Sequence, residues 1–401
     1  MATIILDLDF ETLPEAIENL NGYEYALVLV RLGQKPVGQV RVPIVNNRID
    51  GNDLHTYITD ELGWPFLEKW LQNYLIPHTD VAKIDLPKVT VAICTRNRTE
   101  DLARCLEALL QLPDEGQEVL VIDNNPSTDA TEELLRQYDQ IRYIRDDRPG
   151  LNNARNRALY EAKHEIVAFL DDDTVPDVNW LRTLSSNYDD PFVMCVTGLV
   201  MPFELETEAQ EWFEHFISFT RGFRRKVFER AFHRSFGAGR CGVGANMSVR
   251  RSVLEVIGPF DPALDAGTPT YSGGDNEMFL RILSSGYRIV YDPAALIWHR
   301  HRSTWAELCH QMYGYGVGNC ATWTRKLLID RDFSVLRNAR KTVQRRLAEL
   351  CYALLRRPDH LPLDLIVAML LGYVKGPWAY FVSRRQNLKY QFNYDSRSTN
   401  S

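Results

Sequence analysis

Apolar runs alternate with helix-patterned segments from residue 89 to residue 171. Four of the runs have the length and β-branched content of buried strands, and the segments between them carry apolar residues at helical spacing. The predicted strands are 89–94, 118–122, 141–144 and 166–170, and the predicted helices are 100–112, 127–137 and 152–163. This order predicts an α/β fold with a doubly wound, mostly parallel sheet.

Polar residues follow three of these predicted strands directly. Thr95 follows the first, Asp123 follows the second, and the triplet Asp171-Asp172-Asp173 follows the fourth. Ligands of doubly wound sheets bind outside the carboxyl ends of the strands. Three unpaired carboxylates are costly at a buried strand end, and oxygen ligands suit Mg²⁺ or Mn²⁺. The pattern therefore predicts a cation site, with a solvated acidic turn as the alternative.

A series of motifs, in this order and spacing, resembles those of the family 2 glycosyltransferases with the GT-A fold, which is Rossmann-like. The resemblance implies an inverting, metal-dependent enzyme that moves a sugar from a UDP or dTDP sugar to a hydroxyl acceptor. The final motif looks most like bacterial rhamnosyltransferase-type members, which act in cell-envelope or exopolysaccharide assembly. The motifs are Cys94-Thr95-Arg96-Asn97-Arg98, Val121 to Asn124, Gly150 with Ala154-Arg155-Asn156, Phe169 to Asp173, Gly242 to Arg251, Gly273 to Glu277 and Ile297 to Arg302.

The resemblance implies a donor site that contains a divalent cation. Asp173, in a DXD-type motif, and His299 would bind Mn²⁺ or Mg²⁺. Asp172 would lie near the donor ribose or metal-bound water, and Asp171 beside it could be structural. The cation would offset the negative charge that the leaving diphosphate gains in the transition state. Without the resemblance, a histidine on a strand such as His299 is more often a structural residue.

The nucleotide part of the donor is expected to meet four other residues. Thr95 and Arg96 would line its pocket, and Asp123 would accept a hydrogen bond from a pyrimidine ring N–H. Arg155 would contact the base or the phosphates. Asp123 could instead form an Asx turn with the asparagines that follow it, and Arg155 could be a surface residue of a helix.

Asp275 is the candidate catalytic base. An acceptor hydroxyl is a poor nucleophile, and a positioned carboxylate that takes its proton assists the displacement. Glu277 would lie near Asp275 in the first turn of a helix. Asp275 could also cap this helix, and the two roles are compatible. The chain departs from the family pattern at Gly274, where many relatives carry Glu.

The regions outside the motifs suggest three domains: a small α+β region at 1–86, the catalytic domain at 87–312, and a helical, basic, amphipathic region at 313–401. Residues 25–42 read as a β-hairpin in the first of these. In the third, 336–357 predicts a basic amphipathic helix, and 363–381 is apolar but interrupted. Residues 336–381 could contact a membrane peripherally or pack on the catalytic domain.

Composition narrows the class of protein. The formal net charge of −7 argues against nucleic acid as a partner. Seven cysteines without a CxxC pair favour reduced thiols in the cytoplasm. No run of about 18 apolar residues predicts a transmembrane helix. The expected location is the cytoplasm or the inner face of the cell membrane, and the acceptor could be a glycan, lipid-linked or a small molecule. A nucleotidyltransferase acting on sugar phosphates and a non-catalytic sugar-nucleotide-binding protein remain as alternatives.

Overall fold

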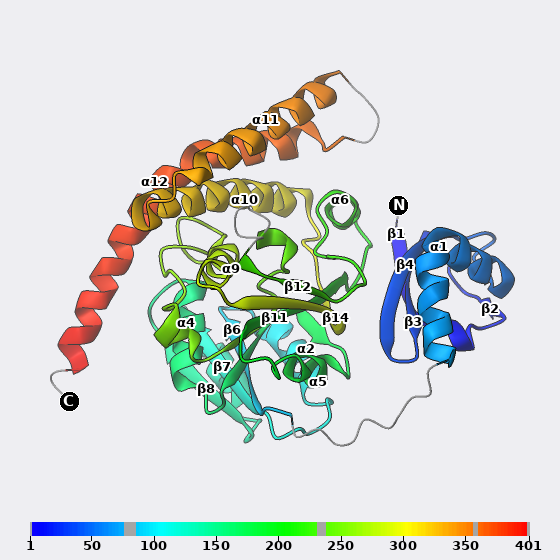
Figure 1. The fold of residues 1–401 in the computed structure, drawn as a ribbon, viewed down its shortest axis with the longest axis horizontal. Helices are drawn as coiled ribbons and strands as arrows, with labels where there is room; N and C mark the ends of the chain where they lie inside the picture. The colour runs from blue at the N-terminus through cyan, green and yellow to red at the C-terminus, as the bar shows by residue number, and fades with distance from the viewer. Residues whose placement is uncertain (1, 76–85, 231–237, 356–359, 399–401) are drawn as a thin grey trace.

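The computed structural model describes residues 2–75, 86–230, 238–355 and 360–398 (Figure 1). A nine-stranded sheet lies at its centre. Its strands are β6 (Val89–Thr95), β7 (Glu118–Asn124), β8 (Ile141–Asp146), β9 (Ile166–Asp171), β10 (Thr174–Pro176), β11 (Val193–Pro202), β12 (Lys226–Phe228), β13 (Asn246–Arg250) and β14 (Arg288–His299). Eight of them run in the order β8-β7-β6-β9-β13-β11-β14-β10, and β12 also pairs with β14.

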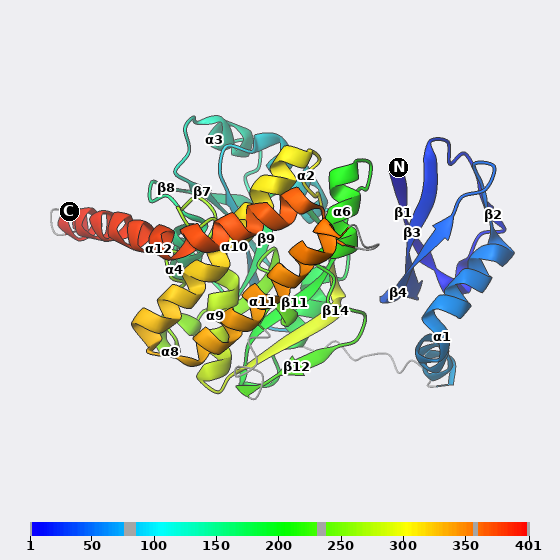
Figure 2. The same cartoon turned by 90° about the horizontal axis from the view of Figure 1, so that it is seen from above.

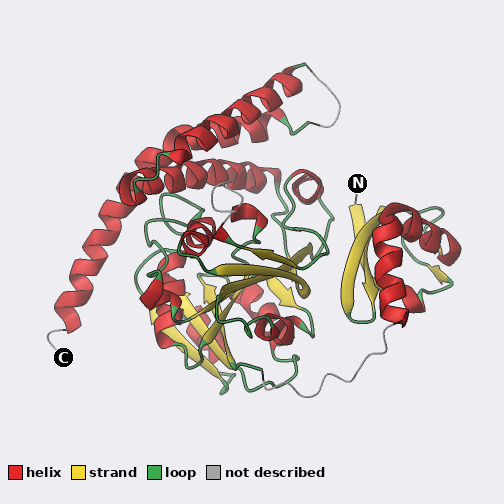
Figure 3. Ribbon diagram, in the orientation of Figure 1, coloured by secondary structure: helices red, strands yellow, loops and turns green. Residues whose placement is uncertain are grey.

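Helices cover both faces of this sheet (Figure 3). Strands β6 to β9 are parallel, so successive connections cross over through helices. Alternate residues of a strand point to opposite faces, and Val91 and Ile93 of β6 accordingly join one core cluster while Ala92 joins the other. The flanking helices are α2 (Thr99–Leu109), α3 (Ala130–Leu135), α4 (Leu151–Glu161), α5 (Trp180–Ser186), α6 (Glu208–Phe216), α8 (Val253–Val256), α9 (Gly274–Ser284) and the 3-10 turn η2 (Ala238–Arg240).

The predicted strand and helix order is confirmed from β6 to β9, and so is the mostly parallel sheet. One predicted element is wrong in extent. The helix expected over 127–137 is reduced to α3, and Asp129 makes no capping hydrogen bond at its start. The backbone N–H of Ser127 instead donates to Asn97 Oδ1 (3.0 Å), so this residue belongs to a loop that joins β7 to the β6–α2 turn.

The amino-terminal region contains the expected hairpin. Strands β3 (Tyr23–Leu32) and β4 (Lys35–Pro43) pair antiparallel, and β1 (Ala2–Asp9) pairs parallel to β3. The helical segment α1 (Gly51–Leu75) covers one face and is kinked at Gly63. The opposite face packs on the central domain through a cluster that includes Leu29, Met201 and Leu296. The region also holds η1 (Phe10–Thr12), β2 (Ala16–Ile17) and β5 (Ile49–Asp50).

Three long helices follow β14 and lie across one side of the central domain (Figures 1 and 2). They are α10 (Trp305–Arg325), α11 (Ser334–Leu354) and α12 (Leu363–Ser398), with a π-helical turn η3 (Lys326–Asp330) after α10. The sequence pattern predicts no spanning helix, yet Leu363–Tyr390 of α12 is long and apolar enough to cross a membrane by length and composition. In its most apolar window, 44% of the helix is buried inside the protein.

Candidate active site

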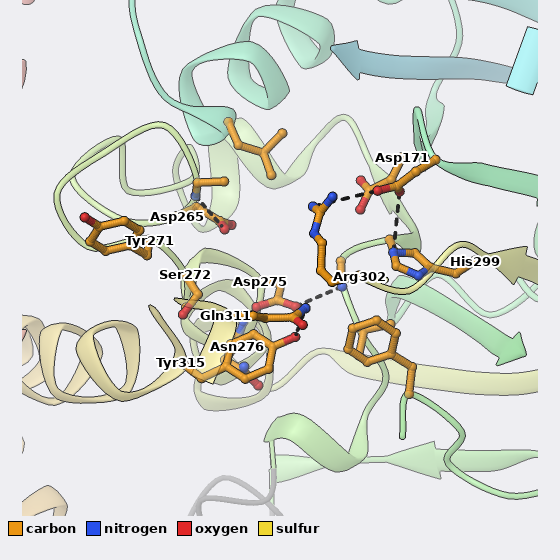
Figure 4. Close-up of a pocket in the computed structure, with 18 of the residues that line it drawn as sticks. Asp171, Asp265, Tyr271, Ser272, Asp275, Asn276, His299, Arg302, Gln311 and Tyr315 are labelled. Atoms are coloured by element: carbon orange, nitrogen blue, oxygen red, sulfur yellow. Dashed lines mark hydrogen bonds and ion pairs between the residues drawn. The ribbon is translucent and has the colours of Figure 1, made fainter. Parts of the chain in front are cut away.

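A cavity of about 670 Å³ opens at the carboxyl ends of β6 and β9. The central domain supplies most of its wall, and α10, α11 and α12 supply the rest through Gln311, Tyr315, Asn319, Arg346 and Met369. Figure 4 shows Asp275 set apart from Asp171 and His299 across this space. The predicted site residues that line it are Thr95, Arg96, Arg155, Asp171, Asp172, Asp173, Asp275 and His299, whereas Asp123 and Glu277 do not.

The acidic triplet lies at the end of β9 and is held by neighbouring polar groups. Thr95 Oγ1 donates to Asp172 Oδ2 (2.7 Å). Arg98 bridges two carboxylates, with Nη1 2.6 Å from Asp172 Oδ1 and Nη2 2.9 Å from Asp173 Oδ2. His299 at the end of β14 places Nε2 3.4 Å from Asp173 Oδ1. Three acidic residues therefore lie close to one arginine and one histidine at the end of β9.

The protonation of this cluster follows from burial and crowding. Burial, together with the charge of Asp173, raises the pKa of Asp171 to about 6 and that of Asp172 to about 7. Burial also acts to raise the pKa of Asp173, but the nearby His299 and Arg98 outweigh it, and the net shift is downward. Burial lowers the pKa of His299 to about 4. At neutral pH Asp173 is ionised and His299 is neutral, the forms that bind metals.

The buried carboxylates of this cluster favour a divalent cation, but the protein offers few ligands to hold one. The cluster carries more buried carboxylate than its cations compensate, as the raised pKa values of Asp171 and Asp172 indicate. Within the four described ranges, however, no group of three or more His, Cys, Asp or Glu side chains is arranged to hold an ion. Asp173 and His299 would provide two ligands to such an ion. Mg²⁺ sites in phosphate-handling enzymes commonly use one or two carboxylates and take their remaining ligands from substrate phosphates and water.

Asp275 lies in the first turn of α9 with its carboxylate held in place. The backbone N–H of Gly244 donates to Oδ2 (2.8 Å), and that of Asn276 donates to Oδ1 (2.6 Å). Gly273 precedes the helix in a left-handed conformation (φ 101°), which favours glycine. The Asp275 side chain contributes to the cavity wall, and these two hydrogen bonds orient it there.

The departure at Gly274 has a steric cause. A Cβ at this position would overlap Asn152 and the Asp265 carboxylate, so no side chain fits. Asp265 reaches this place from a loop, in a left-handed conformation (φ 84°) that is uncommon for Asp. Its Oδ2 lies 2.7 Å from Arg155 Nη1. Arg155 is therefore a buried cavity residue rather than a surface residue, and Asp265 is its partner.

Asp123 lies behind the cavity wall and is fully buried. The hydroxyl of Tyr143 donates to its Oδ2 (3.1 Å), while Oδ1 has no hydrogen-bond partner among the described residues. Burial raises its pKa. The next residue, Asn124, lines the cavity instead. A buried acceptor without a partner is costly, so a donor that reached Oδ1 would be stabilising.

Glu277 lies away from the cavity, in contact with two arginines. Its Oε1 is 2.7 Å from Arg281 Nε and 2.8 Å from Arg325 Nη1. The glutamate side chain is 1% exposed. Because Arg325 belongs to α10, this ion pair joins α9 to α10. The position gives Glu277 a structural role in this conformation, and we do not assign it to the chemistry.

We expect Glu277→Ala to destabilise the fold. Removing one partner of a buried ion pair costs about 3–5 kcal/mol. We expect the lower end of this range, because Arg281 loses its carboxylate partner whereas Arg325 keeps Asp261 and Asp330. Chemical denaturation would measure this as a lower free energy of unfolding, and nucleotide affinity of the folded variant should stay near wild type. Glu255→Ala, at an exposed helical position, is the matched control. Equal stability of the two variants would contradict the structural role.

Sequence reasoning missed three residues that the cavity brings together. Arg98 is the last residue of the motif Cys94-Thr95-Arg96-Asn97-Arg98. Its position three residues after Thr95, at the end of β6, could have predicted that it lies near the site. No pattern in the sequence indicated Asp265, because it is distant from Arg155 along the chain and only the fold brings the two together. Arg221 lines the cavity and donates to the carbonyls of Gly239 (2.5 Å) and Ser218 (2.8 Å), without a carboxylate partner among the described residues. Arg221 belongs to the basic stretch 221–226, which by sequence alone could be a segment that closes over a phosphate or a solvated helix face.

Comparisons with known proteins show what the chain is similar to. The family model described as glycosyl transferase family 2 matches residues 90–258. Glycosyltransferase AglE of Haloferax volcanii is 29% identical over 246 residues, covering 59% of this chain and 75% of AglE. O-antigen chain rhamnosyltransferase RfbN of Salmonella typhimurium is 25% identical over 254 residues, covering 61% of this chain and 76% of RfbN.

Among solved structures, the mannosyltransferase PcManGT of Pyrobaculum calidifontis, in complex with GDP-Man and Mn²⁺, aligns with a TM-score of 0.49 and 18% identity over 80% of this chain and 96% of that one. The sequence matches are the stronger finding. The family-model match runs from β6 to β13 and includes the acidic triplet. Residues 90–258 of the chain are thus similar to the family 2 glycosyltransferases.

Proposed function

We propose that the chain transfers a sugar, with inversion and with the help of Mn²⁺ or Mg²⁺, from a nucleotide diphosphate sugar of the UDP or dTDP type to a hydroxyl acceptor. The observation that carries this proposal is one cavity with two chemically different sides. One side has Asp173 and His299 beside two further acids. The other has Asp275, whose carboxylate is oriented by two backbone N–H groups, while the nearby Asp265 is held in an ion pair with Arg155.

The donor diphosphate is assigned to the side of the acidic triplet. Asp173 and His299 would hold the cation, which supplies Lewis-acid stabilisation to the departing diphosphate when bound. Arg302, whose Nη2 lies 3.9 Å from Asp173 Oδ2, adds positive charge at the same place. The unpartnered Oδ1 of Asp123 supports a base that carries a ring N–H, as uracil and thymine do.

The acceptor is assigned to the side of Asp275. Asp275 would take the proton of the acceptor hydroxyl as it attacks. Inversion is the expected stereochemistry because a direct displacement needs only one carboxylate on the acceptor side, whereas retention through a covalent intermediate needs a second group as the nucleophile. The proposed acceptor is a glycan, a lipid-linked sugar or a small molecule. The proposed donor carries a rhamnosyl or other hexosyl group, and the proposed process is cell-envelope or exopolysaccharide assembly.

A panel of UDP and dTDP sugars, incubated with the protein and Mn²⁺ without acceptor, tests the reaction. We expect slow release of free sugar and nucleoside diphosphate from one donor class, because water replaces the acceptor. A nucleotidyltransferase would attack the α-phosphate and release nucleoside monophosphate. A binding protein would release neither product, and either of these outcomes would overturn the proposal. Heat-denatured protein is the control.

The proposed location is the cytoplasm, with peripheral contact at the inner face of the cell membrane through residues 336–381. Two helices of this region, α11 and α12, contribute residues to the cavity. Residues 356–359 within it lie outside the described part of the chain.

A further inference from the structure

The helix α12 has two apolar faces, and only one of them is covered. The covered face packs on α10, with Leu365, Ile366 and Met369 in a shared core cluster. Gly316 of α10 and Gly372 of α12 meet so closely that neither has room for a Cβ. This contact fixes α12 to the central domain along the first half of its length.

The second apolar face is exposed to solvent. Its members recur every three or four residues, which places them on one side of the helix. Exposed apolar residues gathered on one face of a protein mark sites of interaction. With their exposed fractions, they are Leu363 (43%), Val367 (40%), Leu371 (59%), Val374 (82%), Trp378 (64%), Phe381 (49%) and Leu388 (57%). We call these seven residues the α12 stripe.

Positive charge surrounds the α12 stripe. Residues 334–390 contain eleven Lys or Arg and three Asp or Glu, in a chain whose net charge is −7. Lys375, Arg384, Arg385 and Lys389 are exposed on α12 itself, and none of them has a carboxylate partner among the described residues. An apolar strip with unpaired cations beside it is complementary to a surface that offers both anionic headgroups and acyl chains.

Residues of the second half of α12 outside the stripe are hydrogen-bonded to the central domain, which limits how α12 can meet a bilayer. Tyr380 OH donates to Asp261 Oδ2 (3.1 Å), and Asn387 Nδ2 donates to the carbonyl of Pro262 (2.8 Å). Asn153 Nδ2 donates to Asn387 Oδ1 (3.1 Å). A helix that crossed the bilayer would have to break these bonds and expose the α10 contact.

We propose that the α12 stripe lies in the plane of an anionic membrane surface, with its apolar side chains between the headgroups, while the opposite face of α12 stays on α10. This specifies the membrane contact of the proposed function and goes beyond it, since it names the face, the lipid class and an orientation parallel to the bilayer. The helix whose inner face contributes Met369 to the cavity is then the helix that docks the enzyme.

Vesicle flotation of the full chain tests the proposal. Wild type should float with phosphatidylglycerol-containing vesicles at low salt, float at least tenfold less with pure phosphatidylcholine, and be released by alkaline carbonate. Val374→Asp with Trp378→Asp should reduce the bound fraction at least tenfold. The matched control is Val45→Asp with Trp64→Asp, two residues of the amino-terminal region that are 64% and 68% exposed. It should bind as wild type does.

Three outcomes would overturn the proposal. Wild type could remain unbound, it could resist carbonate as a spanning helix does, or the stripe variant could bind as well as the control. Light scattering of the free protein adds a further check, because self-association that the stripe variant abolishes, without flotation, would assign the face to a second copy of the chain. Donor hydrolysis in solution should be equal in both variants, so a failure here is distinct from a failure of the proposed reaction.

Discussion

Asp275→Asn should lower the rate of sugar transfer by about 10²-fold or more while leaving nucleotide affinity near wild type. Asn keeps the size of the side chain, and its amide oxygen can still accept a hydrogen bond from Gly244 or Asn276, but it cannot take a proton from the acceptor. The diphosphate is assigned to the opposite side of the cavity, so its binding should survive. Steady-state kinetics and calorimetry with the nucleoside diphosphate would together measure the two effects.

The matched control is Asp129→Asn, at the start of α3, where the carboxylate is 67% exposed and does not line the cavity. It should retain full activity. Turnover of Asp275→Asn within a few-fold of wild type would show that Asp275 only caps α9. Loss of nucleotide affinity together with turnover would show instead that the variant disturbs the donor site.

Asp173→Ala should abolish the dependence of donor binding on metal. In wild type we expect Mn²⁺ to strengthen nucleoside diphosphate binding by about 10²-fold or more, since loss of even an outer partner of a metal site commonly costs 10–100-fold. Titration calorimetry with Mn²⁺ and with chelator, on both proteins, would measure the difference. His299→Ala should show the same loss to a smaller degree.

The metal assignment depends on wild type as much as on the variant. Equal affinity of wild-type protein with and without Mn²⁺ would exclude it. Asp173 also pairs with Arg98, so thermal unfolding of Asp173→Ala should be recorded alongside. Asp172→Asn removes the charge of the other carboxylate that pairs with Arg98 and should reduce the metal effect less than Asp173→Ala does, which separates ligation from local charge.

The strands and the residues at their ends were predictable because both depend on local pattern. A buried parallel strand is a continuous apolar run, and the polar residue that ends it must lie at the ligand-binding edge. Thr95, Asp171 and Asp173 reach the cavity for this reason. Asp123 follows the same rule, but its side chain lies behind the wall, since the residue after it takes the position at the edge.

Contacts made between distant segments were not predictable. Glu277 is two residues from Asp275, close enough to suggest a shared site, yet on a helix such residues point in different directions. The partner that determines its role, Arg325, comes from another helix. The α12 stripe was not predictable either, because it depends on which face of α12 another helix covers. Its residues are interleaved with those of the buried face, so the segment resembles an interrupted apolar run until α10 covers one side.

The filled space at Gly274 limits how this protein could change. A glutamate at 274 would have to displace the carboxylate of Asp265, which is the partner of Arg155. Either exchange alone leaves a clash or a buried arginine without its counter-charge. The positions are therefore expected to be epistatic: Gly274→Glu should be harmful alone and less harmful together with Asp265→Gly. Because a Cβ at 274 also overlaps the Asn152 side chain, an evolutionary route between the two arrangements would have to rearrange Asn152 as well.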